Sequence, residues 1–249
     1  MSKLWEEKDI NQEMEIRSIV KLFILHLLPG ATLSIIYIVL LKAGILSEFP
    51  KLVVLGLAGI LSIVPMELGY LFYVSKKEVG SLNIFKMLGL KSNLKLKEYI
   101  IYAPLLLIIT GLIMTALKPL SNYLLNTVFS FIPTWYNCNQ DVSTYGKNSL
   151  ILLILVSFFF FTLIGPIVEE LYFRGYLLAR MKWMGKYSVL LNAALFAVYH
   201  FWTPWLIAAR FAAFLPLYYC VYKKDSLKLA ILVHCLANFT DVIAFVMLL

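Results

Sequence analysis

Residues 150–178 read LILLILVSFFFFTLIGPIVEELYFRGYLL, an apolar run that ends in two adjacent glutamates and an arginine. The run before Glu169 is long enough to enter a bilayer, since a spanning helix needs about 20 mostly apolar residues. A charged side chain at bilayer depth costs a few kcal/mol, so such residues usually have a partner or a function. The stretch therefore predicts a membrane helix with a functional polar cluster.

The composition of the whole chain also indicates a membrane protein. Of the 249 residues, 61% are hydrophobic and only 14% are charged, whereas soluble domains have about a quarter charged residues. The net charge of +8 comes from basic residues between the apolar segments, which indicates membrane topology and no nucleic-acid partner. The three cysteines are too few and too scattered for a disulfide framework or a metal site. We expect a multi-pass protein of the cell membrane.

The apolar segments predict an all-α bundle of about seven spans. They lie at residues 22–41, 52–74, 99–117, 149–171, 187–203, 205–222 and 229–248. Basic residues cluster in three alternate connections, namely 75–98, 180–186 and 223–228. The positive-inside rule therefore places the N-terminal segment 1–21 in the cytosol. The connection 118–148 is predicted to face outward, and its aromatics and Pro133 suggest an interfacial helix.

Few ionisable side chains stand out within these spans, and two of them lie in the first half of the chain. His26 is alone, and we interpret it as a neutral ring bonded to a backbone carbonyl. Glu67 follows Pro65, where a break in the helix could supply a donor. The others fall in the second half: Glu169, Glu170, Arg174, His200, His234 and Asp241.

In the second half, the polar residues recur at helical spacing. Glu170 and Arg174 are four residues apart, which puts opposite charges on one helix face. Glu169 is turned about 100° away from that face, so this carboxylate is left for chemistry.

The later spans repeat the four-residue spacing. Phe196 and His200 form one such pair, and His234 and Asn238 form another. A rise of 1.5 Å per residue puts Glu169, His200 and His234 roughly 9–21 Å from their nearest basic connections. Residues at these depths could share one cavity.

This combination of side chains suits hydrolysis by an activated water. Glu169 could act as the general base, with His200 sharing or positioning the proton. His234 and Asn238 could donate to the oxyanion that develops on a peptide carbonyl. No serine or cysteine nucleophile is needed, and we interpret Cys235 as a packing residue.

Asp241 lies seven residues after His234, on nearly the same helical stripe. Eight apolar residues follow it, so it is not expected at the membrane surface. An unpaired carboxylate at this depth would be costly. We therefore expect Asp241 to cap the closed end of the cavity, bonded to a donor from another span.

Three motifs resemble those of a known family. EELYFR at 169–174 matches EExxxR, FAVYH at 196–200 matches FxxxH, and HCLAN at 234–238 matches HxxxN. In this order they resemble the CPBP intramembrane proteases, which include type II CAAX prenyl endopeptidases and bacteriocin-processing or immunity proteins. The resemblance covers about residues 149–245. We accordingly divide the chain into the segment 1–21, the spans and outer loop of 22–148, and a catalytic region at 149–249.

The resemblance implies a glutamate-dependent endopeptidase without a cofactor, whose cavity opens to the cytosol. Its substrate would be a membrane-associated or lipidated peptide or protein, and its oligomeric state is left open. Carried over by motif, the catalytic residues would be Glu169, His200, His234 and Asn238, and the supporting ones Glu170, Arg174 and Phe196. Many members have two serines upstream of the second motif, where this chain has Asn192 and Ala193. That departure leaves helix packing or substrate preference in doubt.

Two other classes of function fit the same residues. Glu169, His200 and His234 are suitable zinc ligands in type and number, although the HExxH motif is missing. A membrane immunity or scaffold protein could use the same cavity for binding alone. A transporter is disfavoured because the two halves of the chain show no symmetry.

Overall fold

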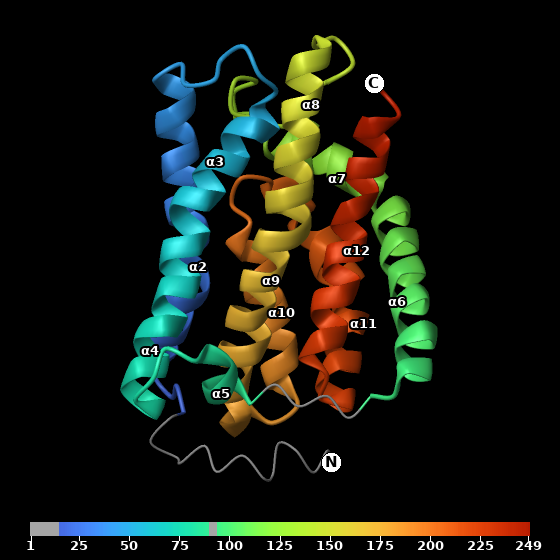
Figure 1. Cartoon of the computed structure of the whole chain (residues 1–249). Coiled ribbons are helices and arrows are strands. Elements are labelled where there is room, and N and C mark those ends of the chain that lie inside the picture. Colours follow the sequence, from blue (N-terminus) through green and yellow to red (C-terminus); the bar gives the residue numbers. More distant parts are fainter. Residues whose placement is uncertain (1–14, 90–93) are drawn as a thin grey trace.

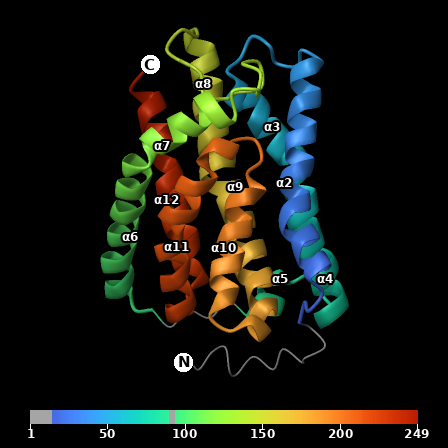
Figure 2. The same ribbon diagram turned by 180° about the vertical axis from the view of Figure 1, so that it is seen from behind.

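The computed structural model of the protein describes residues 15–89 and 94–249. Every regular element in this part of the chain is a helix. The long helices run side by side as one bundle (Figure 1, Figure 2). The predicted all-α membrane bundle is confirmed.

The helices of the first half begin after a short extended segment. They are α2 (Ile19–Lys42), α3 (Lys51–Ile63), η2 (Val64–Leu68), α4 (Gly69–Val79), α5 (Ile84–Leu88), α6 (Leu96–Ala116), α7 (Lys118–Tyr123) and η3 (Leu124–Val128). The second half contains α8 (Lys147–Val156), η4 (Ser157–Ile164), α9 (Gly165–Glu169), η5 (Glu170–Leu177), η6 (Leu178–Met184), α10 (Tyr187–Tyr199), η7 (Pro204–Leu206), α11 (Ile207–Lys224) and α12 (Leu227–Val246). The elements η2, η3, η4 and η5 are π-helices, and η6 and η7 are 3₁₀-helices.

Six helices in the described part of the chain are long and apolar enough to cross a membrane. They are Ile19–Lys42, Lys51–Val79, Leu96–Ala116, Lys147–Met184, Pro204–Lys224 and Leu227–Val246. They correspond to six of the seven predicted spans. The fifth prediction, residues 187–203, was too long, because α10 has 13 residues. Such a helix is about 20 Å long, shorter than the roughly 30 Å hydrocarbon core.

The chain turns back after α10 for a local reason. Thr203 precedes Pro204, and a residue before proline is disfavoured in the α-helical region. The turn between α10 and α11 therefore lies within the bundle, below the ends of α8 and α12 (Figure 1).

The connection 118–148 covers this turn. It begins with a helix made of α7 and η3, whose position at the membrane interface stays a prediction, and it then packs Tyr136 and Cys138 into the core. The Tyr37 hydroxyl donates to the Tyr136 carbonyl at 3.1 Å, and the Tyr136 hydroxyl donates to the Phe201 carbonyl at 3.4 Å. These bonds hold the connection over the residues that follow α10.

The outer surface of the bundle is apolar, as a lipid-facing surface requires. Val20 is 70% exposed, and Ile100 and Leu112 are each 65% exposed. The described parts of the predicted basic connections lie at the end of the bundle where α2 begins (Figure 1). The cytosolic location of segment 1–21 stays a prediction, because residues 1–14 lie outside the described part, as does Lys91.

Candidate active site

The helix that carries the first motif is irregular on both sides of Glu169. The π-helix η4 ends at Ile164, the short α9 ends at Glu169, and the π-helix η5 begins at Glu170. π-Helical segments are rare and are frequent at functional sites. Glu169 and Glu170 therefore lie at a junction between two helical geometries.

Glu170 and Arg174 form the predicted ion pair. Arg174 Nη1 lies 3.4 Å from Glu170 Oε1, and both side chains are buried. The guanidinium carbon also lies 3.9 Å from the ring centre of Phe196 and 3.4 Å from that of Tyr218. Stacking on aromatic faces stabilises a desolvated cation. The phenylalanine of the second motif therefore packs against the arginine of the first.

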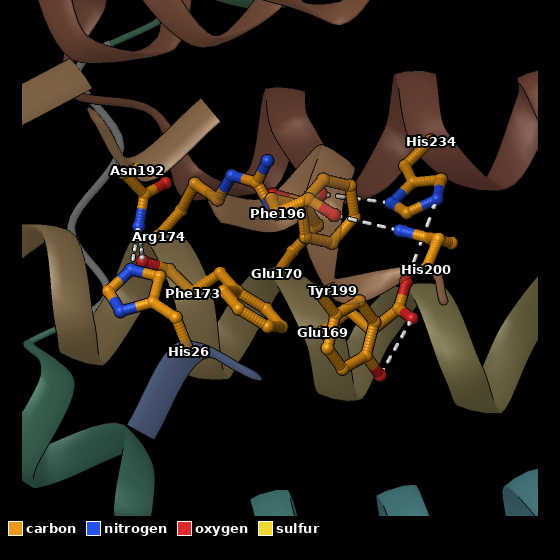
Figure 3. A network of polar contacts seen from close by, with 10 residues as sticks. All are labelled: His26, Glu169, Glu170, Phe173, Arg174, Asn192, Phe196, Tyr199, His200 and His234. Carbon is orange, nitrogen blue, oxygen red and sulfur yellow. Dashed lines mark hydrogen bonds and ion pairs between the residues drawn. The ribbon is translucent and has the colours of Figure 1, made fainter. Parts of the chain in front are cut away.

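His234 has a partner that spacing did not predict. Its Nδ1 donates to Glu170 Oε1 at 2.9 Å, and its Nε2 lies 3.8 Å from Glu169 Oε2 (Figure 3). Glu170 is thus shared between Arg174 and His234. Because Nδ1 is used in this bond, Nε2 is the ring atom that faces Glu169.

His200 lies at the end of α10, and only its Nδ1 atom is used in a hydrogen bond within the protein, which leaves Nε2 available. Its Nδ1 donates to the Phe196 carbonyl at 2.8 Å. A carbonyl oxygen only accepts, so the hydrogen is on Nδ1 and the lone pair is on Nε2. The ring packs against Phe196 and Trp202, with ring centres 4.8 Å away in each case.

Tyr199 joins two buried carboxylates. Its hydroxyl lies 2.8 Å from Glu67 Oε1 and 3.3 Å from Glu169 Oε1. A hydroxyl has one hydrogen, so it donates fully to only one carboxylate at a time. Glu67 lies in the π-helix after Pro65, which agrees with the predicted break in the helix. Sequence analysis overlooked Tyr199, although it adjoins His200.

Asn238 and Asp241 differ from the expectation in their partners. Asn238 Nδ2 donates to the Phe161 carbonyl at 2.7 Å, which uses one of its two amide hydrogens. Asp241 is exposed and lines the same cavity. The donor that we expected for Asp241 from another span is absent among the described residues.

His26 and Asn192 form a separate buried contact next to the motifs. His26 Nδ1 donates to the Leu22 carbonyl at 2.8 Å, which confirms the interpretation of His26. Asn192 Nδ2 lies 3.1 Å from both His26 Nε2 and the Phe173 carbonyl (Figure 3). Asn192, where many members of the resembling family have serine, therefore packs α10 against α2 and η5.

The predicted catalytic side chains line one cavity of about 290 Å³. This volume is close to the lower limit for ligand pockets, about 300 Å³. The lining includes Glu169, His200, His234, Asn238, Asp241 and Arg210.

The cavity extends toward one end of the bundle. Its lining reaches Leu52, Cys138 and Phe245, at the end that carries the C-terminus and the connection 118–148 (Figure 1). No described residue of the three basic connections lines it. The lysine pattern therefore predicts that this cavity faces the outside, whereas the resemblance implied an opening to the cytosol.

Two further residues of the lining were not predicted. Arg210 is an arginine within an apolar span, and this was the signal that sequence analysis missed. Cys138 is the thiol in the lining, and burial raises the pKa of the Cys138 thiol to about 11. The thiol therefore remains protonated near neutral pH and is a poor nucleophile.

The zinc alternative requires that at least three ligand side chains point at one metal ion. Among the described residues, no three His, Cys, Asp or Glu side chains are arranged to hold a metal ion. The proposed set of Glu169, His200 and His234 thus gains no support from geometry.

Comparison with known proteins identifies the region that contains all three motifs. Residues 151–240 match the family model described as type II CAAX prenyl endopeptidase Rce1-like. Searches of curated proteins and of solved structures gave no match. The match shows that residues 151–240 are similar to the Rce1-like type II CAAX prenyl endopeptidases, which is consistent with the CPBP proteases that the motifs resemble.

Proposed function

We propose that this protein is an intramembrane endopeptidase that hydrolyses a peptide bond of a membrane-associated or lipidated substrate, with a water activated by Glu169. The Rce1-like region supports an intramembrane protease. The observation that carries the glutamate mechanism is the shared cavity, which brings Glu169, His200 and His234 together from three helices.

The hydrogen bonds of Glu169 and His200 indicate the role of each residue in the reaction. Glu169 takes a proton from water as the water oxygen attacks the carbonyl carbon. Nε2 of His200, which bears a lone pair, orients the same water. The carbon–nitrogen bond breaks when the proton passes from Glu169 to the leaving nitrogen, which yields an amine and a carboxylic acid that keeps the second hydrogen of the water.

The oxyanion needs donors on the opposite side of the carbonyl group. His234 donates from Nε2 when its ring carries a second hydrogen, and Glu170 at 2.9 Å from Nδ1 stabilises that charged ring. Asn238 donates its second amide hydrogen, since the first is bonded to Phe161. Glu170 therefore supports His234 as well as Arg174.

The test compares peptides released from membranes that contain wild-type protein, Glu169→Gln or Glu48→Gln. Glu48 is an exposed glutamate and serves as the matched control. Glu169→Gln should reduce release by at least about 100-fold, the lower end for general-base catalysis, and Glu48→Gln should leave it unchanged. Identical peptide profiles for wild type and Glu169→Gln would eliminate the mechanism and favour the immunity or scaffold alternative.

A further inference from the structure

Arg210 has hydrogen-bonding capacity inside the cavity that the protein does not use. Its Nη2 donates to Thr203 Oγ1 at 3.1 Å. Its Nη1 is buried and has no hydrogen-bond partner. The residue lines the same cavity as Glu169 and His200.

The other arginines of the chain, all in the described part, have glutamate partners. Arg17 pairs with Glu15, Arg174 with Glu170 and Arg180 with Glu78. Arg174 and Arg180 also stack on aromatic rings.

Arg210 has neither kind of partner among the described residues. Asp241 lines the same cavity but forms no ion pair with Arg210. An arginine remains charged at all accessible pH values, and a buried charge without a partner is costly. Glu169 attracts Arg210 electrostatically but forms no ion pair with it, so Arg210 keeps the capacity to bind an anion that enters the cavity.

The surroundings of Arg210 define the rest of that ligand. The Thr203 backbone N–H donates to the His200 carbonyl at 3.0 Å, so the bond between Arg210 and Thr203 fixes the guanidinium to the turn that carries His200. The lining of the cavity also includes apolar side chains, among them Leu33, Leu55, Phe160 and Phe214. A short apolar peptide with a carboxylate fits both the charge and the wall.

We propose that Arg210 binds a carboxylate of the peptide substrate and thereby positions the cleaved bond relative to Glu169; this inference rests on the proposed function. The planar guanidinium matches a carboxylate through two parallel hydrogen bonds. The carboxylate is either the chain end or an acidic side chain, and both sources present the same group to Arg210.

The test measures binding in detergent, with thermal unfolding as the readout, in wild-type protein and in Glu169→Gln, which cannot consume the peptide. The probes are N-acetyl-trileucine with a free carboxylate, the same peptide as its amide, and an amidated version that contains glutamate. We expect the free acid or the glutamate peptide to bind at least about tenfold more tightly than the plain amide, because an added charge-assisted hydrogen bond has this effect. The stronger of the two identifies the source of the carboxylate.

Substitutions then test whether Arg210 causes the preference for the acidic peptides over the plain amide. Arg210→Gln should abolish it and Arg210→Lys should retain part of it, whereas Arg17→Gln, which changes an exposed arginine, should keep it in full. If Arg210→Gln does not fold, Thr203→Val provides the second test, because it releases the guanidinium from its anchor and should weaken the preference.

Three outcomes would overturn the assignment. The first is that the wild type binds the acidic peptides and the amide equally well. The second is that Arg210→Gln still prefers the acidic peptides. The third is that phosphatidylglycerol micelles bind in an Arg210-dependent way and neither acidic peptide does. Each is a binding result, so it is independent of whether Glu169→Gln loses peptide release. The carboxylate site and the glutamate mechanism can therefore fail separately.

Discussion

Glu169 and Glu170 are neighbours in the chain, yet they belong to two different regions of the molecule. Glu170 lies in a paired region, where Arg174 and His234 both contact its Oε1 atom and aromatic rings cover the arginine. Glu169 lies in a cavity region together with His200 and Arg210. In the paired region opposite charges lie next to one another, whereas Arg210 of the cavity region forms no ion pair with a described carboxylate.

This difference separates the residues that stabilise the fold, around Glu170, from those that could act on a substrate, around Glu169. A buried ionic group that is fully paired is costly to disturb, because its partner is left without compensation. A group that faces a cavity can bind a substrate or a water without losing an internal bond. The two regions should therefore respond to mutation in different ways.

The largest expected effect concerns the compartment that the cavity region faces. In a variant without Cys138, Cys220 and Cys235, a membrane-impermeant thiol reagent applied to intact cells should label Thr144→Cys and not Lys77→Cys. The reason is that lysines concentrate at the end of the bundle opposite the cavity. The reverse labelling would place the cavity end in the cytosol, as the family resemblance implied.

The paired region should govern stability. Glu170→Gln leaves Arg174 buried without a carboxylate, which should cost about 3–5 kcal/mol of unfolding free energy, measured by thermal unfolding in detergent. Glu169→Gln should cost much less, because Glu169 has no arginine partner among the described residues. The double variant Glu170→Gln/Arg174→Met should regain part of the loss. Equal unfolding temperatures for Glu170→Gln and Glu169→Gln would contradict the distinction between the regions.

A smaller effect is expected where α2 approaches the end of α10. A Cβ atom on Gly30 would lie 1.9 Å from the Tyr199 carbonyl oxygen, so this carbonyl would have to move. Gly30→Ala should destabilise the protein by about 1–3 kcal/mol. It should also lower peptide release, since His200 follows Tyr199 directly.

The matched control for Gly30→Ala is Gly111→Ala on α6. A Cβ atom there meets nothing within 4 Å, and alanine is the better helix former by up to about 1 kcal/mol. If Gly30→Ala is as active and stable as Gly111→Ala, the close approach of α2 does not position His200.

The smallest expected effect is that of a chelator. Purified protein dialysed against a strong chelator should retain its turnover, because Glu169 activates the water in the proposed mechanism without a metal. Loss of turnover that zinc alone restores would favour the metal alternative for Glu169, His200 and His234.

The sequence by itself determined the features that depend on local spacing. Apolar length predicted the membrane helices, and a separation of four residues predicted the pair of Glu170 and Arg174. The bond from His26 to the Leu22 carbonyl is also local, because both residues lie on one helix. In these cases helix geometry alone brings the partners together.

Only the tertiary structure decided how the spans share their polar groups. His234 meets Glu170 across 64 residues, and Tyr199 meets Glu67 across 132 residues. The cavity also depends on the tertiary structure, because its lining combines residues of several helices with Cys138 of the connection 118–148. Arg210 forms no ion pair because no described carboxylate lies within ion-pair distance of it. Spacing along one helix could not predict this, because the partners of Arg210 would have to come from neighbouring helices.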